Sequence, residues 1–249
     1  MQRYFIEVSY KGTHYSGFQV QHNAPTIQSA LEKALFTLFR QNIVLTGSSR
    51  TDAGVHALQN FFHFDTDLAI ARRHLYNINA ILPHDISVKN MYPVNPDAHC
   101  RFNAVSREYK YFIYRNKDPF LYETAWYYPF TIDIDTLHST AAFLLGQHDF
   151  TSFSKRNTQV KTFNCTLEQS QWSYENECLV YTVTANRFLR GMVRGLVSTM
   201  LKLSRSNLGP TDLAGIIESK DCRNADFSAP PHGLFLMKVN YDWPLTQID

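Results

Sequence analysis

In some segments of the chain apolar residues alternate with polar ones, as in strands, and in others they recur at helical spacing. These segments do not follow a regular strand, helix, strand order. Apolar residues three and four apart predict helices over 26–39 and 71–81, one that ends at Leu145 before Gly146, and an amphipathic one over 189–203. Helices set between hairpin-like strands are typical of α+β proteins with antiparallel sheets. We therefore predict the α+β class, with strands expected over 5–10, 58–64, 109–115, 162–172, 178–185 and 234–239.

The turn residues from Tyr92 to Pro96 predict a connection between two units. We place the boundary close to Cys100. The expected N-terminal unit covers 1–100, and the expected C-terminal unit covers 101–249.

The composition excludes several classes of protein. No apolar run reaches the roughly 18 residues that a membrane span needs. In the first ten residues polar and apolar side chains alternate, which predicts a strand and differs from the continuous apolar run of a secretory signal. The four cysteines have no CxxC spacing, so they predict neither a zinc site nor a disulfide framework. A reducing, cytoplasmic location fits this pattern best.

Positive charge is concentrated in two segments although the net charge is only +2. Residues 186–207 hold five Lys and Arg and no acid, and residues 99–117 hold five Lys and Arg against one Glu. Such runs are found on solvated surfaces and on surfaces that bind polyanions, and charge alone does not separate the two interpretations.

The segment 47–56, GSSRTDAGVH, has the residues most suited to chemistry. From its residue types alone it is either a structural turn around Asp52 or a loop that presents a carboxylate. Ser48 and Ser49 lack the Gly-x-Ser-x-Gly pattern of a hydrolase nucleophile, and His56 and His63 have no metal-ligand spacing. We therefore assign no metal.

Residues 50–56, RTDAGVH, resemble the signature of the tRNA pseudouridine synthase A family. Further similarities follow in the family's order over nearly the whole chain, with two departures: Ser49 replaces the usual Gly and Phe18 the usual Trp. The other similar segments are 10–19 (YxGxxYxGFQ here), 26–35, 101–102 with 106–111 (RF and SREYKY), 188–194 (FxxxMVR) and 233–236 (GLFL).

The resemblance implies that Asp52 is the catalytic nucleophile, with Tyr109 and Arg194 as the other catalytic residues. Tyr109 is expected to stack on the uracil and move a proton, and Arg194 to pair with the Asp52 carboxylate. Arg50 is the expected wedge that fills the place of the everted uridine, and Leu234 the apolar wall beside the base. The reaction exchanges an N-glycosidic for a C-glycosidic bond without net redox change, so no cofactor is expected.

The resemblance also implies two related units whose mainly antiparallel sheets join into one extended sheet, helices packed on it, and an active-site cleft between the units. The substrate implied is the tRNA anticodon stem-loop at positions 38 to 40, and the implied assembly is a homodimer. Two alternatives stay open. One is a catalytically silent RNA-binding protein of the same fold, and the other is a hydrolase that uses Asp52 with His56.

Overall fold

The computed structural model describes residues 1–155 and 160–248, which divide into two compact units. Unit 1 comprises Met1–Val105 and Phe235–Asp249, and unit 2 comprises Ser106–Leu234. The first boundary lies close to the predicted connection. The C-terminal residues from Phe235 onward belong to unit 1, whereas the prediction placed them in the C-terminal unit.

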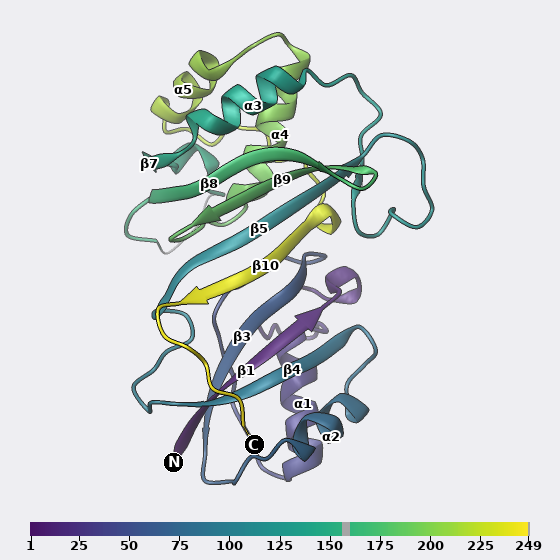
Figure 1. Ribbon diagram of the computed structural model, residues 1–249, viewed down its shortest axis with the longest axis vertical. Helices are drawn as coiled ribbons and strands as arrows, with labels where there is room; N and C mark the ends of the chain where they lie inside the picture. The colour runs from purple at the N-terminus through teal and green to yellow at the C-terminus, as the bar shows by residue number, and fades with distance from the viewer. Residues whose placement is uncertain (156–159, 249) are drawn as a thin grey trace. The chain divides into compact units, whose positions relative to one another are not determined.

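Unit 1 is a mostly antiparallel sheet with two helices, and its strands can be followed in Figure 1. Strand β1 lies between β4 and β3 and is antiparallel to both. The start of β3 pairs in parallel with β10, and its later part pairs with the short β2. The elements are β1 (Gln2–Tyr10), α1 (Ile27–Phe39), β2 (Thr46–Gly47), β3 (His56–Thr66), α2 (Arg73–Ile81), β4 (Ile86–Val94) and β10 (Leu234–Tyr241).

Helix α1 forms where the sequence predicts it, because both its start and its inner face are specified locally. The Thr26 hydroxyl accepts the Ser29 N–H, and the Ser29 side chain bonds back to Thr26, which together make a capping box. Leu31 and Leu35 are fully buried one turn apart on the inner face. Helix α2 ends before Pro83, because the residue before a proline is driven out of the helical region.

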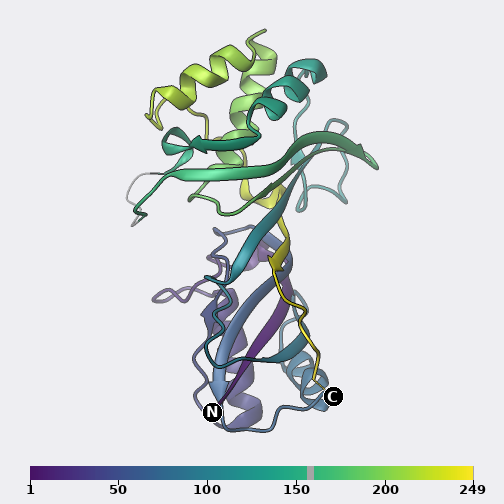
Figure 2. The same cartoon turned by 60° about the vertical axis from the view of Figure 1, so that its left-hand side comes forward.

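Unit 2 contains the strands β5, β9, β8 and β7, which pair antiparallel in that order, with β6 in parallel beside β5. Helices α3, α4 and α5 lie together on one side of β8 and β9, as the two views in Figures 1 and 2 show. The elements are β5 (Ala104–Tyr114), β6 (Trp126–Tyr127), α3 (Ile134–Phe143), β7 (Gly146–Asp149), β8 (Asn164–Glu175), β9 (Cys178–Ala185), α4 (Met192–Arg205) and α5 (Pro210–Glu218).

The α+β prediction is confirmed, and so are most of the predicted elements. The sequence did not predict β4 or α5, and the predicted connection over 92–96 overlaps the end of β4. Strand β4 tolerates Pro93 because it lies at an edge of the unit 1 sheet, where an N–H is not needed on the outer side. Among the described residues, no helix is both long and apolar enough to cross a membrane.

Candidate active site

The two predicted site residues of unit 1, the catalytic Asp52 and the substrate-binding Arg50, lie in the loop that joins β2 to β3. The loop is anchored at its start by Ser48 N–H, which donates to the Phe61 carbonyl at 2.8 Å. It turns at Asp52, whose carbonyl accepts the Val55 N–H at 3.2 Å. Gly54 makes this turn with φ of +77°, a conformation that favours glycine. Arg50 is exposed and Asp52 is partly buried, so the loop presents both residues at or near the surface.

A buried polar network holds this loop from beneath. The Asn60 side chain is fully buried on β3 and donates through Nδ2 to the Ser49 carbonyl at 2.8 Å and to the Tyr10 hydroxyl at 3.1 Å. Its Oδ1 accepts the Phe61 N–H at 2.8 Å. The Tyr10 and Thr51 hydroxyls are bonded at 2.8 Å. Buried polar groups that satisfy one another fix a single arrangement, so the backbone on either side of Arg50 is held in place.

The N-terminal motif packs directly against the same loop. The Gly12 N–H donates to Nδ1 of His56 at 3.0 Å, and the Phe18 N–H donates to the Thr51 carbonyl at 3.1 Å. A Cβ on Gly12 would lie 2.1 Å from the Val55 carbonyl oxygen, so only glycine fits there. The two segments that resemble family motifs are therefore one physical unit.

His56 is not placed to act as the general base of a hydrolase. Its side chain is 1% exposed, and its Nδ1 lone pair accepts the Gly12 N–H. In a neutral imidazole the other nitrogen then carries the proton, so neither nitrogen offers a lone pair to substrate. The ring also packs on Phe235 with centroids 4.6 Å apart. His56 has a structural role in supporting the loop.

The two departures from the family motifs are both accommodated. The Phe18 ring is 1% exposed and stacks on Phe62 with centroids 4.3 Å apart and planes at 9°. It also lies against Gly47, where a Cβ would come within 2.1 Å of the ring. The Ser49 side chain is buried, and its hydroxyl lies 3.5 Å from that of Ser48. Phe18 and Ser49 are therefore both accommodated as buried side chains with packing or polar neighbours.

The other predicted site residues lie in unit 2. Tyr109 is on β5, 8% exposed, with its ring edge-on to Phe188 at a centroid distance of 4.9 Å. Arg194 is in the first turn of α4, and its Nε donates to the Ala229 carbonyl at 2.6 Å. Leu234 begins β10 and is 7% exposed. It stays a prediction that Asp52 and Arg194 act on the same bound nucleoside.

The segment 229–234 connects Arg194 with Leu234. Its Ala229 carbonyl accepts the bond from Arg194, and its Pro230 carbonyl accepts the Tyr111 hydroxyl at 2.8 Å. Gly233 packs on the Tyr111 ring so closely that a Cβ would lie 2.8 Å from Cζ. Burial raises the pKa of Tyr111 far above its ordinary value, against a smaller opposing effect of the Arg194 charge. Tyr111 is therefore a neutral hydrogen-bond donor that fixes the backbone next to Leu234.

Comparison with known proteins identifies the family to which this arrangement belongs. The profile of the family described as tRNA pseudouridine synthase matches residues 6–103 and 140–242. The chain belongs to this family. It is accordingly an isomerase that acts on tRNA.

Three similar proteins, each named tRNA pseudouridine synthase A, show how far the likeness extends. The protein of Parabacteroides distasonis is 41% identical over 251 aligned positions that cover all of both chains. That of Porphyromonas gingivalis is 42% identical over 97% of this chain and 98% of its own. That of Staphylococcus aureus is 37% identical over 96% of this chain and 91% of its own.

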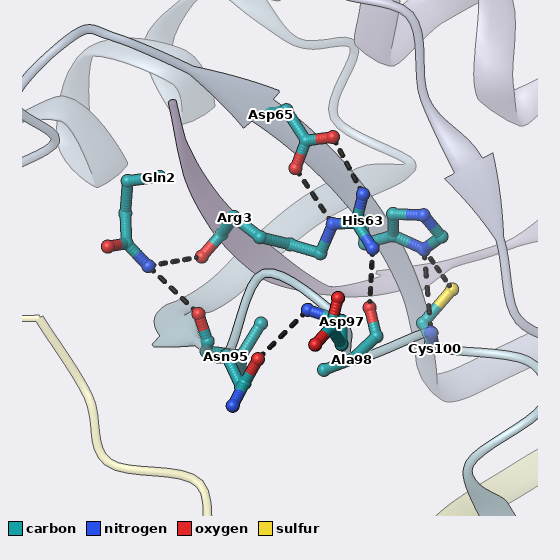
Figure 3. Close-up of polar contacts among 9 residues, drawn as sticks. Gln2, Arg3, His63, Asp65, Asn95, Asp97, Ala98 and Cys100 are labelled. Carbon is teal, nitrogen blue, oxygen red and sulfur yellow. Dashed lines mark hydrogen bonds and ion pairs between the residues drawn. The ribbon is translucent and has the colours of Figure 1, made fainter.

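Among the described residues of this pseudouridine synthase, one group has the composition of a metal site. His63, His99 and Cys100 bring possible ligand atoms within 4.8 Å of one another. The lone pairs are already used, however. Nδ1 of His63 accepts the backbone N–H of Cys100 and lies 3.2 Å from its sulfur (Figure 3), the Cys100 thiol donates to the Thr46 carbonyl, and Nδ1 of His99 accepts the Arg101 and Phe102 N–H groups. A cation would have to displace these bonds, so the group does not fit a metal site.

Sequence reasoning missed the residues that support the loop. Asn60 lies within the aromatic-rich stretch predicted as a strand, and a single amide at an inward position of such a strand is the signal that was available. Tyr10 was noted as part of a motif, but its hydroxyl contact to Thr51 depends on the pairing of β1 with β3. Neither contact is visible from spacing along the chain.

Proposed function

We propose that the protein converts uridines at positions 38 to 40 of the tRNA anticodon stem-loop to pseudouridine, with Asp52 as the nucleophile. The observation that carries the proposal is the partly buried Asp52 at the turn of a loop held by the buried Asn60, Tyr10 and Thr51 network. Such a loop offers a carboxylate in a fixed position without enclosing it. A base turned out of the RNA stack can therefore reach it.

A carboxylate suits this isomerisation because the base must be detached, rotated and rejoined through carbon. Asp52 can add to the uracil ring or to the anomeric carbon of the ribose, and in both routes the leaving step returns the carboxylate unchanged. The bond from the ribose to uracil nitrogen breaks, and a bond from the same ribose carbon to uracil carbon forms. The proton on that uracil carbon is then removed and the detached ring nitrogen takes up a proton, so the product has the same atoms as the substrate. No electrons are gained or lost overall, so no redox cofactor is required.

We assign the remaining roles by the match to the family motifs. Arg194 is the cation that stabilises an ionised Asp52 when the site excludes water, since a guanidinium binds a carboxylate with two parallel hydrogen bonds. Its Nε bond to the Ala229 carbonyl supports a fixed orientation of the group. Tyr109 stacks on the uracil and moves a proton, and Leu234 forms an apolar wall beside the base. Arg50 enters the RNA stack where the uridine leaves, a role that its exposure permits.

The assembly and location follow the same reasoning. We assign the protein a homodimeric state and a cytoplasmic location, where its tRNA substrate is found. Light scattering coupled to gel filtration tests the first assignment, since a homodimer doubles the mass of 28.8 kDa calculated for one chain.

One experiment separates the synthase from the two alternatives. Anticodon stem-loop RNA is incubated with the protein and with the variant Asp52→Asn, and pseudouridine is mapped chemically while RNA binding is measured by anisotropy. The wild type should form pseudouridine, and the variant should bind the RNA and form none, because an amide is not a nucleophile here. Asp67→Asn, which changes an exposed carboxylate of the same unit, is the matched control and should remain active.

The outcomes distinguish the three functions. A wild-type protein that binds RNA without changing it is a silent RNA-binding protein, and release of free uracil identifies a hydrolase. Pseudouridine formation by Asp52→Asn at the wild-type rate removes Asp52 from the mechanism.

A further inference from the structure

The segment His99–Asn103 of unit 1 is a short turn closed by its own hydrogen bonds. The His99 N–H donates to the Asn103 side chain at 2.6 Å, and the Asn103 N–H returns to the His99 carbonyl at 3.0 Å. The N–H groups of Arg101 and Phe102 both point at Nδ1 of His99, at 3.1 and 3.4 Å. The backbone that carries Arg101 and Phe102 is therefore ordered.

Cys100 anchors this turn to the sheet of unit 1. Its side chain is fully buried, with the sulfur 3.2 Å from Nδ1 of His63 on β3 and 3.2 Å from the Thr46 carbonyl on β2. Its own carbonyl accepts the Tyr241 hydroxyl of β10 at 2.6 Å. Figure 3 shows Cys100 held beside His63. Three strands thus fix the position from which the next two side chains project.

Phe102 projects from this anchored turn into solvent. It is 74% exposed, yet one side of its ring is supported by the His99 ring, with centroids 4.2 Å apart. His99 in turn lies edge-on to His63, at 4.6 Å and 67°. The Arg101 guanidinium carbon is 5.7 Å from the Phe102 centroid. Single exposed apolar residues are ordinary, but Phe102 is the outermost of three contacting rings and has a cation over its ring, which together make a preformed surface.

We propose that Phe102, with Arg101 beside it, is a stacking platform for an unpaired nucleobase of the bound RNA. A flat apolar ring matches the face of any base, and an adjacent guanidinium matches the phosphate that the base carries. Arg101 supplies a positive charge at the platform itself, which complements a polyanion. This inference rests on the proposed function, because it assigns a further contact to the same RNA.

The platform is connected to the catalytic loop through Thr46 of β2, although Phe102 and Asp52 are 50 residues apart in the sequence. Cys100 contacts Thr46, and Asp52 follows Thr46 by six residues, which span at most about 20 Å when extended. A base on Phe102 is therefore within a few nucleotides of a uridine at Asp52. Unpaired bases near the target occur in the loop of a stem-loop and are absent from a plain duplex. Stacking on Phe102 would favour the loop over the duplex.

The test measures binding of two fluorescently labelled RNAs, the anticodon stem-loop and a blunt duplex of the same stem sequence. Phe102→Leu keeps an apolar side chain but removes the ring, and should weaken stem-loop binding about tenfold while duplex binding stays unchanged. Phe102→Trp retains a stacking surface and should bind both RNAs like the wild type. Phe120→Leu, which alters a 90% exposed phenyl of unit 2, is the matched control.

Two results overturn the inference: unchanged stem-loop binding by Phe102→Leu, or equal losses for the stem-loop and the duplex. The melting temperature of each variant is recorded, and an unaltered value shows that the loss is not one of folding. Pseudouridine formation by the wild type is measured on the same stem-loop. Its absence contradicts the proposed function, whereas its presence together with unchanged binding by Phe102→Leu contradicts the platform alone.

Discussion

Acid destabilisation of this protein should depend strongly on one buried histidine. His63 is 7% exposed on β3, and its pKa is lowered from 6.5 to about 4, mainly by burial. The charges of His99 and Arg3 lower the pKa further, while Asp65 opposes the shift. Figure 3 shows why Asp65 has a limited effect on His63: both of its oxygens face the Arg3 guanidinium, at 2.7 Å each.

The magnitude follows from linkage between protonation and unfolding. Between pH 6.5 and about 4 the unfolded chain binds a proton at His63 and the folded chain does not, so the free energy of unfolding falls as pH falls through this window. The full difference in pKa, at ~1.4 kcal/mol per pH unit, corresponds to ~3 kcal/mol. Between pH 7 and pH 4.5 about 2 kcal/mol of this should be lost.

The assay is urea unfolding at a series of pH values, followed by circular dichroism and by tryptophan fluorescence to test for a single transition. Carboxylates also titrate at low pH, so the wild type is compared with His63→Gln, which cannot bind the proton. The wild type should lose about 2 kcal/mol more than His63→Gln between pH 7 and pH 4.5. His22→Gln removes an exposed histidine but leaves His63 in place, and should keep the wild-type dependence.

The neutral state of His63 is refuted if His63→Gln and the wild type lose stability in parallel over this range. The lower stability of the variant at pH 7 is not itself informative, because the substitution also removes the hydrogen bond to Cys100.

Two further predictions concern the support of the catalytic loop. Asn60→Leu removes the side chain that bonds to the Ser49 carbonyl and the Phe61 N–H, and should lower the free energy of unfolding by ~2–3 kcal/mol. It should also lower kcat by a larger factor than it weakens RNA binding. Urea unfolding and enzyme kinetics measure both effects, and Asn42→Leu, which changes an exposed asparagine of the same unit, is the control. A wild-type kcat in Asn60→Leu would contradict the positioning role. Gly12→Ala should displace the loop and abolish activity, since its Cβ would meet the Val55 carbonyl oxygen at 2.1 Å. Gly215→Ala, on the open side of α5, should instead raise the free energy of unfolding by ~0.5–1 kcal/mol, and equal effects of the two substitutions would contradict the steric argument.

The local features of this protein were predictable because they depend on neighbours in the sequence. The capping box at Thr26 and the inward leucines of α1 specify that helix without reference to the rest of the chain. The RTDAGVH motif is also contiguous, and its resemblance to a family signature, not its residue types alone, indicated the chemistry. Strand β4 was missed because Pro93 and its polar neighbours look like a turn, and only its position at a sheet edge makes a strand possible there.

Residue patterns along the chain were enough to predict the α+β class and most of the elements, and the motif resemblance supplied the candidate nucleophile. Only the folded chain shows that β10 pairs with β3, that Asn60 bonds to Ser49 and Tyr10, and that Cys100 anchors the turn carrying Phe102. The physical reason is that a buried donor or acceptor must find a partner, and these partners lie far away along the chain. Periodicity records which side of an element faces inward, but it does not record which group that side meets.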